Sequence, residues 1–575
     1  MTENPTLLTE KRSETNTGLW IILGVWFGIN LLQTIFSGLM DDEALFWLYG
    51  QHMAWGFYEH PPMVAWLIKG GYTLLPNAVG VRLFFIISST LSVYLIARLA
   101  GTKNWWLFAA LLFSTLIGNA GGFLAAPDGP LLLFTALFFF FYQRFLEEEK
   151  IPDALWLGLV MAGLIYSKYN GILVIFFTIL SNLKLVTRKR FYLAVITGII
   201  LFLPHILWQF FNDFPTIRYH LVERNIHEYD FFSYFGEYIA GQFGIYGPLL
   251  AFVFFWMTFA YKTEDLFERS LKFTGIGFLL FFLLYTFRGR IEPNWTLPAF
   301  IPFMILTLRS LVKRKGLRRV VYPLAVISAL IILGFRVYII HDYLHLPKKL
   351  VNLREFQRDR SWADAIAEKA GGNPVLFLNS YQNPSKYIFY TDQPAFDLTE
   401  YDNHVTQFNY WPEMINAFQG KTVMVVDNNA WRKMPDMQLI TFPNSDTLYY
   451  SFIHDFSSYT TIPLVIPGEP LRFPVGEVID LPVRLLNPEK HPIRFDRNPD
   501  QRSSLVYSIL EETEFVAREK PGPDITSVEL PVAGFDTVIR ILTPETPGHY
   551  ELYVSLKTGW LPPGQNGQRQ SMEIY

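Results

Sequence analysis

The stretch that decides the fold is residues 18–47, GLWIILGVWFGINLLQTIFSGLMDDEALFW, where a long apolar run meets three consecutive acids. A helix needs about 20 apolar residues to cross the hydrocarbon core of a bilayer, and the run before Ser37 satisfies this length. Lys11 and Arg12 precede the run, but no clear small-residue cleavage site follows it. We therefore expect a retained first membrane span rather than a cleaved signal peptide.

Similar apolar stretches recur through the following three hundred residues or so. They lie near 80–100, 105–124, 129–146, 152–167, 170–186, 191–210, 240–261, 271–287, 295–311 and 319–340. Each approaches the length that a bilayer core requires, so we expect about eleven membrane helices between residues 18 and 340. The predicted fold class is a polytopic α-helical membrane protein.

The composition agrees with a membrane protein and excludes several other classes. Of the 575 residues, 51% are hydrophobic and 17% are aromatic. The net charge of -3 gives no basic domain of the kind that nucleic-acid binding requires. Because the chain has no cysteine, disulfides, thiolate metal sites and cysteine nucleophiles are excluded.

The distribution of Lys and Arg predicts the orientation in the membrane. If residues 1–17 lie in the cytoplasm, the inward-facing loops hold most of the basic residues of the first 340, among them Lys103, Arg188 and Lys313. Cytoplasmic loops characteristically retain Lys and Arg. We therefore expect a multi-pass protein of the cytoplasmic (inner) membrane, whose chain after about residue 345 is extracytoplasmic.

The predicted outer loop and tail have distinct patterns. Within the loop 39–79, the pieces Glu43–Trp55 and Pro62–Tyr72 are amphipathic and aromatic, so we expect them to lie in the headgroup plane. A helix-like stretch and short apolar runs predict an α/β domain over 345–450. From 460 to 575, short β-prone runs alternate with Pro, Gly and Asn turns, which predicts a β-sandwich.

The outer loop carries two groups of polar residues that are candidates for chemistry. They are Asp41, Asp42 and Glu43 after the first span, and Tyr58, Glu59 and His60 further along the loop. Asp42 and Glu43 could simply cap the next helix, since acids stabilise a helix N-terminus. Capping does not explain the second acid, Glu59, whereas a general base with a second polar or metal-binding carboxylate would.

A lone acid, Asp128, lies between two apolar stretches in the sequence APDGP at 126–130. Pro, Asp and Gly are usual turn residues, so a turn is the alternative interpretation. The predicted topology puts Asp128 on the same face as Asp42 and Glu59. We therefore expect the three carboxylates to converge.

Basic residues are also expected on this outer face. They are Lys168, followed by Tyr169, and Arg218, Arg224, Arg288 and Arg290. Cations beside acids at a membrane surface suit an anionic lipid headgroup, because guanidinium groups bind phosphate oxygens bidentately. The alternative is that these side chains extend to the interface or neutralise the acids.

These motifs together resemble a known family. The first loop contains DDEA at 41–44, GFYEHPP at 56–62 and GVR at 80–82, and later landmarks are YSKY at 166–169 and NW at 294–295. They resemble the bacterial GT-C glycosyltransferases, in the branch of the aminoarabinose transferase of lipid A and related protein mannosyltransferase-like enzymes. The resemblance covers residues 18–340, and the terminal β-sandwich lies outside the minimal family.

The resemblance implies a glycosyltransferase that uses a sugar carried on a polyprenyl phosphate. It further implies a lipid, glycan or protein acceptor in the cell envelope and inversion at the anomeric carbon. Asp42 is then the base, with Asp41 as its possible substitute, while Glu59 orients the acceptor or holds a divalent cation and Asp128 supports it. The residues implied in substrate binding are Glu43, Tyr58, His60, Lys168, Tyr169, Arg288 and Arg290.

A divalent metal ion is the only cofactor that these residues suggest. Glu59 and His60 are the candidate ligands, and two ligands are few for a metal site. The lipid A branch often has Lys after the second acid, where this chain has His60. The departure puts phosphate or metal contacts at that position in doubt.

Two other functions fit parts of the pattern. A transporter or flippase of lipid-linked sugars also places acids and bases along a membrane path. Charges near the bilayer middle and discontinuous helices would favour it, whereas the charges here cluster at one face. A non-catalytic envelope scaffold, whose exposed tail recruits partners, would be supported if the tail bound protein while Asp42→Ala left activity intact.

Overall fold

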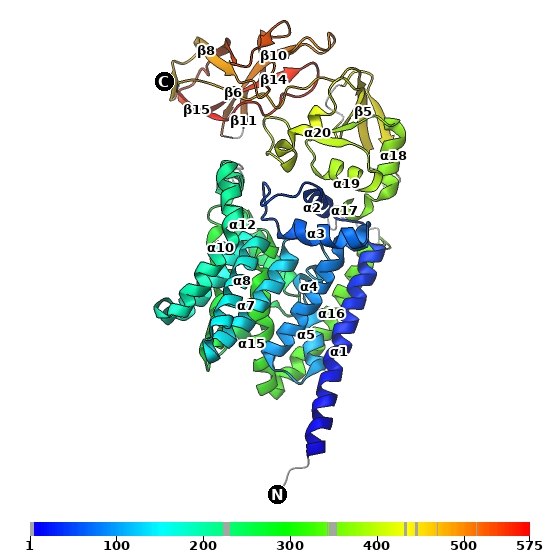
Figure 1. Cartoon of the computed structure of the whole chain (residues 1–575), viewed down its shortest axis with the longest axis vertical. Coiled ribbons are helices and arrows are strands. Elements are labelled where there is room, and N and C mark those ends of the chain that lie inside the picture. Colours follow the sequence, from blue (N-terminus) through cyan, green and yellow to red (C-terminus); the bar gives the residue numbers. More distant parts are fainter. Residues whose placement is uncertain are drawn as a thin grey trace. The chain divides into compact units, whose positions relative to one another are not determined.

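The computed structural model describes residues 5–221, 230–341, 343, 354–429, 434–442, 447–468, 470–512 and 514–575. The described residues form two compact units, which meet in sequence between Gln357 and Arg358. We call residues up to 357 the membrane unit and residues 358–575 the tail unit (Figure 1).

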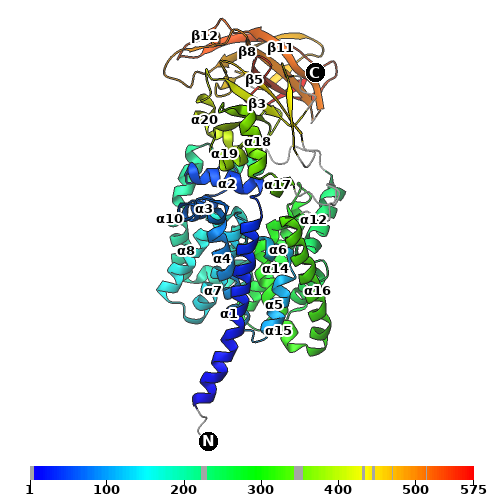
Figure 2. The same cartoon turned by 90° about the vertical axis from the view of Figure 1, so that its right-hand side faces the viewer.

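The membrane unit is helical. Its helices are α1 Pro5–Phe36, α2 Asp41–Gln51, α3 Met63–Leu74, α4 Ala78–Ala100, α5 Trp105–Phe113, α6 Leu116–Ala120, α7 Asp128–Glu148, α8 Ile151–Ser167, α9 Ile172–Ser181, α10 Lys189–Phe211, α11 Pro215–Leu221, α12 Phe231–Ile245, α13 Ala251–Ala260, α14 Leu266–Tyr285, α15 Phe300–Lys313, α16 Lys315–Ile340 and α17 Arg354–Gln357. The short 3-10 helices η1 Tyr169–Gly171, η2 Leu183–Thr187 and η4 Pro293–Ala299 connect several of them. Helix α4 packs against both α1 and α7 (Figures 1 and 2).

Several helices have the length and composition of membrane spans. In the part of the chain that the structure describes, six qualify: Thr17–Phe36, Ala78–Ala100, Asp128–Glu148, Lys189–Phe211, Pro293–Lys313 and Lys315–Ile340. Shorter apolar helices cover Ile151–Ser167, Tyr169–Ser181 and Ala251–Ala260. The expected multi-pass helical fold is confirmed, and the number of eleven spans stays a prediction.

Two predicted spans are interrupted, and the interruptions meet in space. The stretch 105–124 breaks at Ser114, and the stretch 240–261 breaks around Gly247, whose φ is 107°. A Cβ on Gly247 would lie 2.6 Å from the carbonyl oxygen of Ser114, which accepts a hydrogen bond of 2.9 Å from Ser328 Oγ. Broken helices are tolerated at membrane depth where neighbouring groups satisfy the freed backbone, and this contact does so.

The prediction that the first piece of the outer loop is amphipathic was wrong. Nearly every residue of α2 is buried, so the helix has no solvent-facing stripe. The reason is that the following loop folds back onto α2: Phe57 stacks on Tyr49 with centroids 4.1 Å apart, and His60 lies edge-on to Phe46 at 5.4 Å. Helix α3 does have one buried face.

The membrane unit has two ends with different side chains. Arg82 lies near the start of α4 and contacts Glu43 of α2, whereas Ala100 is the last residue of the same helix. At 1.5 Å per residue these two positions are about 27 Å apart, close to a bilayer's hydrocarbon thickness. We call the end with α2 and Arg82 the acidic end and the end with Ala100 the basic end.

The first part of the tail unit has an α/β arrangement. Its elements are α18 Arg360–Ala370, β1 Val375–Leu378, α19 Gln382–Thr391, β2 Ala395–Leu398, η5 Gln407–Tyr410, α20 Pro412–Asn416, β3 Val423–Asp427, β4 Gln438–Thr441 and β5 Thr447–Ile453. The sheet order is β2-β1-β3-β5-β4, with β1 parallel to β2 and β3 and with β5 antiparallel to its neighbours.

The rest of the tail unit is β-structure. Its strands are β6 Leu464–Val465, β7 Leu471–Phe473, β8 Val478–Leu485, β9 Ile493–Arg494, β10 Ser503–Glu511, β11 Glu514–Asp524, β12 Glu529–Leu530, β13 Phe535–Leu542, β14 Gly548–Thr558 and β15 Gln570–Ile574. Sheets β11-β10-β14-β15-β7 and β13-β8-β6 contribute to one apolar core. The β-rich C-terminal region expected from the sequence is confirmed.

Candidate active site at the acidic end

A buried ion pair organises the start of α2. Arg82 donates to Glu43 through Nε at 2.7 Å and through Nη2 at 2.5 Å, and both side chains are almost fully buried. Glu43 also accepts the backbone N–H groups of Met40 and Ala125, each at 2.8 Å. Both carboxylate oxygens are therefore occupied by protein donors, which makes Glu43 an anchor of the site.

The same arginine fixes the turn that joins α1 to α2. Its Nη1 donates to the carbonyl oxygen of Ser37 at 3.1 Å, and its Nη2 donates to that of Gly38 at 2.8 Å. The guanidinium also lies over the ring of Phe123. Arg82 thus connects the end of α1, the first turn of α2 and the segment before α7.

The three consecutive acids have three different environments. Asp41 is 5% exposed and Glu43 is 1% exposed, whereas Asp42 is exposed. The pKa of the Tyr49 phenol is raised, first by burial and next by the negative charges of Glu59 and Asp42. The charges of Glu59 and Asp42 therefore both act on the same buried phenol, and Asp42 is the exposed one of the three consecutive acids.

The loop carrying Glu59 is held against α10. The Nδ1 of His205 lies 2.6 Å from the carbonyl oxygen of Trp55. A Cβ on Gly56 would lie 2.3 Å from the ring of Trp208, so only glycine lets the loop approach this closely. Thr216 of α11 donates to the carbonyl oxygen of Phe57 at 3.1 Å. These contacts fix the backbone immediately before Tyr58 and Glu59.

Tyr169 joins this loop to the helices through a chain of hydrogen bonds. Its hydroxyl lies 2.8 Å from His205 Nε2 and accepts from Gln209 Nε2 at 3.0 Å. Gln209 also donates to Thr216 at 2.6 Å. Tyr169 therefore supports the loop that carries Glu59, because its partner His205 also contacts the carbonyl oxygen of Trp55.

A second charged cluster surrounds Asp128 at the start of α7. Lys168 Nζ donates to both carboxylate oxygens of Asp128 at 3.0 Å, and Asn294 Nδ2 donates to Oδ2 at 3.0 Å. The side chains of Lys168 and Asp128 are only 13% and 14% exposed. This cluster combines one acid, one cation and one amide.

Short links in the chain bring the two clusters to the same end of the unit. Ala125, which donates to Glu43, is three residues before Asp128. Lys168 is adjacent to Tyr169, whose histidine partner holds the Glu59 loop. Asp42, Glu59, Asp128 and Lys168 therefore all lie at the acidic end.

The other predicted cations have different surroundings. Arg290 forms an exposed pair with Glu237 at 3.0 Å, and Arg288 is also exposed. Arg218 lies on α11, and Arg224 is outside the described residues. The role of these arginines in holding phosphate stays a prediction.

Sequence reasoning missed three residues of the site. It did not assign roles to Arg82, to Asn294 or to the contact between His205 and the loop. An arginine within an apolar membrane helix indicates a buried ion pair, because a cation there needs a partner, and Arg82 is indeed 0% exposed. Asn294 belongs to the NW landmark at 294–295, but its contact with Asp128 depends on how α7 and η4 pack and is not visible in the sequence.

The chain is similar to several known proteins. Residues 59–208 match the dolichyl-phosphate-mannose-protein mannosyltransferase family. The lipid A galacturonosyltransferase RgtD of Rhizobium johnstonii is 24% identical over 413 residues, which are 66% of this chain and 83% of that protein.

Among solved structures, ArnT of Cupriavidus metallidurans has a similar fold. In the apo state it gives a TM-score of 0.55 at 15% identity, and the match covers 75% of this chain and 97% of ArnT. ArnT bound to undecaprenyl phosphate gives 0.56 at 14% identity, with the same coverage. The sequence-based recognition is confirmed at this level: residues 59–208 match a glycosyltransferase domain of the GT-C class, and the chain has an ArnT-like fold.

Proposed function

We propose that this enzyme transfers a sugar from a polyprenyl-phosphate donor to a lipid, glycan or protein acceptor at the outer face of the cytoplasmic membrane. The proposal rests on one observation: Asp42, Glu59 and the Asp128–Lys168 pair all lie at one end of the membrane unit. The relatives support it, since RgtD is named for lipid A and ArnT has been solved with undecaprenyl phosphate.

Asp42 is proposed as the general base because it is exposed while both neighbouring acids are buried. The acceptor oxygen attacks the anomeric carbon and gives its proton to the Asp42 carboxylate. The bond between the anomeric carbon and the phosphate oxygen breaks, and polyprenyl phosphate leaves with the electron pair. Attack opposite the leaving group inverts the configuration at that carbon.

Lys168 is proposed to face the departing phosphate. Its ammonium is held by Asp128, which fixes its position and leaves one further N–H for a phosphate oxygen. A positioned cation stabilises the negative charge that develops on the leaving group. Arg288, Arg290, Tyr58, Tyr169 and His60 are proposed to complete the substrate contacts.

Glu59 is proposed to orient the acceptor hydroxyl. A divalent cation would need more than Glu59 and His60, and the described residues bring together no group of three His, Cys, Asp or Glu ligands. Glu59 then works by hydrogen bonding, beside the phenol of Tyr49 on which its charge acts.

The test is sugar transfer by the purified full chain, with a set of polyprenyl-phosphate sugars and envelope acceptors. We expect Asp42→Asn to lower kcat about 100-fold or more, the usual contribution of a general base. Glu59→Gln is expected to raise the acceptor KM more than it lowers kcat. Glu147→Gln is the matched control, because Glu147 is an exposed acid at the far end of α7.

Full activity of Asp42→Asn would contradict the assignment of the base. Movement of the intact donor across vesicles, with no sugar transferred by the wild type, would instead support a flippase.

A further inference from the structure

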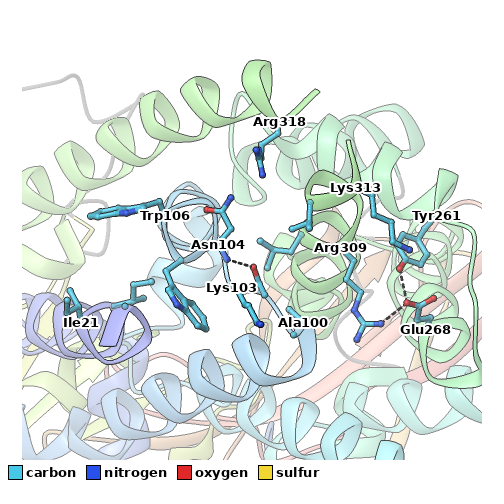
Figure 3. A pocket seen from close by; sticks show the side chains of 17 residues that line it. Ile21, Ala100, Lys103, Asn104, Trp106, Tyr261, Glu268, Arg309, Lys313 and Arg318 are labelled. Atoms are coloured by element: carbon cyan, nitrogen blue, oxygen red, sulfur yellow. Dashed lines mark hydrogen bonds and ion pairs between the residues drawn. The ribbon is translucent and has the colours of Figure 1, made fainter. Parts of the chain in front are cut away.

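A cavity of about 940 Å³ lies at the basic end of the membrane unit, far from the acids just described. It is lined by the start of the span in α1, by residues 100–106 between α4 and α5, and by parts of α14, α15 and α16 (Figure 3). Ala100 lines it, whereas Arg82 of the same helix belongs to the acidic end. The cavity is therefore separate from the proposed active site.

The charges that line this cavity are predominantly positive. They are Lys103, Arg309, Lys313 and Arg318, against one acid, Glu268. Figure 3 shows Glu268 on one side, where Arg309 pairs with it at 2.6 Å.

Two of the four cations are paired with a carboxylate, and two form no ion pair within the described ranges. Arg309 is paired with Glu268, and Lys313 is paired with Glu264 at 2.6 Å. Within the described ranges, Lys103 and Arg318 form no ion pair, and Arg318 extends toward the cavity in Figure 3. Two uncompensated cations at one cavity attract an anion.

The remaining walls are apolar and aromatic. Trp106 is 78% exposed and Ile21 is 60% exposed, and both lie across the cavity from Glu268 (Figure 3). The indole Nε1 of Trp105 is buried and has no hydrogen-bond partner among the described residues. Tryptophan is enriched where a membrane meets water, so these walls suit the boundary between a headgroup and its acyl chains.

We propose that this cavity binds the phosphate headgroup of an anionic membrane lipid from the leaflet at the basic end. Lys103 and Arg318 contact the phosphate oxygens, as a basic pocket between membrane helices does for anionic headgroups. The acyl chains lie along Ile21 and Trp106. The site is distinct from the one that binds the sugar donor.

Basic residues at this end are also expected from topology alone, because cytoplasmic loops retain Lys and Arg. A topological role requires only that the charges stay on this side. It does not require that they line a cavity beside exposed aromatic rings. A control that removes equal charge from the same end, outside the cavity, separates the two explanations.

The test is titration of the purified full chain with phosphatidylglycerol, read as bound lipids by native mass spectrometry. We expect the double variant Lys103→Gln, Arg318→Gln to bind phosphatidylglycerol at this site with an affinity about 30-fold lower, which appears as one fewer bound lipid. Each cation near a membrane surface contributes about a factor of five to the affinity for an anionic lipid. The control is Lys315→Gln, Arg319→Gln, which removes two exposed cations that do not line the cavity.

Equal losses in the variant and the control would overturn the proposal, and so would equal binding of phosphatidylcholine. Saturation by inorganic phosphate in place of lipid would show a site for a free anion and overturn the lipid assignment. If the double variant does not fold, Trp106→Ser replaces it and is expected to weaken phosphatidylglycerol several-fold. Sugar transfer by the same preparation tests the proposed function separately.

Discussion

At the scale of single residues, three neighbouring acids with the same chemistry do different work. Asp42 is open to a substrate, Asp41 is buried and Glu43 is bound on both oxygens by Arg82 and backbone donors. Because the acids are consecutive, the sequence does not decide whether Asp41 or Asp42 is the proposed base. The exposure of Asp42, beside two buried acids, supports Asp42 as the proposed base.

The buried pair of Glu43 and Arg82 leads to a prediction about stability. Glu43→Gln leaves the Arg82 guanidinium buried without its counter-charge, and breaking a buried pair in this way costs about 3–5 kcal/mol. We expect a large drop in the unfolding midpoint of the chain in detergent. Glu148→Gln, from an exposed pair with Lys150, is the control and is expected to leave the unfolding midpoint almost unchanged, because exposed ion pairs contribute little to stability. Equal effects of the two changes would contradict the anchoring role of Glu43.

At the scale of elements, strand β2 of the tail unit carries a buried acid with a predictable pH effect. Burial raises the pKa of Asp397 from 3.8 to about 6, although Ser380 N, Thr399 Oγ1 and Thr406 Oγ1 donate to it. The folded state thus holds the proton more tightly than the unfolded state. The contribution of Asp397 to stability is therefore full below pH 3.8 and is lost as the pH rises through about 6.

We expect the wild type to lose about 2 kcal/mol from this group between about pH 4 and 7, and Asp397→Asn to remove that loss. The measurement is urea unfolding of the full chain, followed by hydrogen exchange in β1, β2 and β3. Asp364→Asn, an exposed acid on α18, is the matched control. If the stability of Asp397→Asn fell with pH as much as that of the wild type, burial of the ionised Asp397 carboxylate would not be the cause of the loss of stability.

The sequence predicts some elements well because their periodicity matches their burial. Along β8, Leu481, Val483 and Leu485 are buried and the residues between them are exposed, which matches the alternation of apolar and polar residues in the sequence. The breaks at Ser114 and Gly247 are not visible in hydropathy, since apolar residues continue on both sides of each break. They depend on a contact between segments far apart in the chain.

At the scale of the whole molecule, the orientation in the membrane can be tested directly because the chain has no cysteine. Lys315 begins α16, whose 26 residues are long enough to cross a bilayer before the tail unit begins. We expect a membrane-impermeant maleimide to label Lys520→Cys in intact spheroplasts and to label Lys315→Cys only after lysis. The reverse pattern would contradict the extracytoplasmic location proposed for the tail unit.

The sequence predicts that certain acids and one lysine lie on a common face, but it does not predict the geometry of the candidate site. The placement of Asp42, Glu59, Asp128 and Lys168 on one face follows from counting spans and basic residues. The pairing of Lys168 with Asp128 joins residues 40 positions apart, and Asn294 reaches Asp128 from 166 positions away. Such contacts depend on helix packing, which hydropathy and motifs do not specify.

A cryo-EM structure of the full chain with a bound polyprenyl phosphate tests most directly whether the donor binds at the acidic end. We expect the phosphate to lie at the acidic end, within contact distance of Lys168 and on the same side as Asp42 and Glu59. A phosphate found only in the cavity of Lys103 and Arg318, or at neither end, would contradict this expectation.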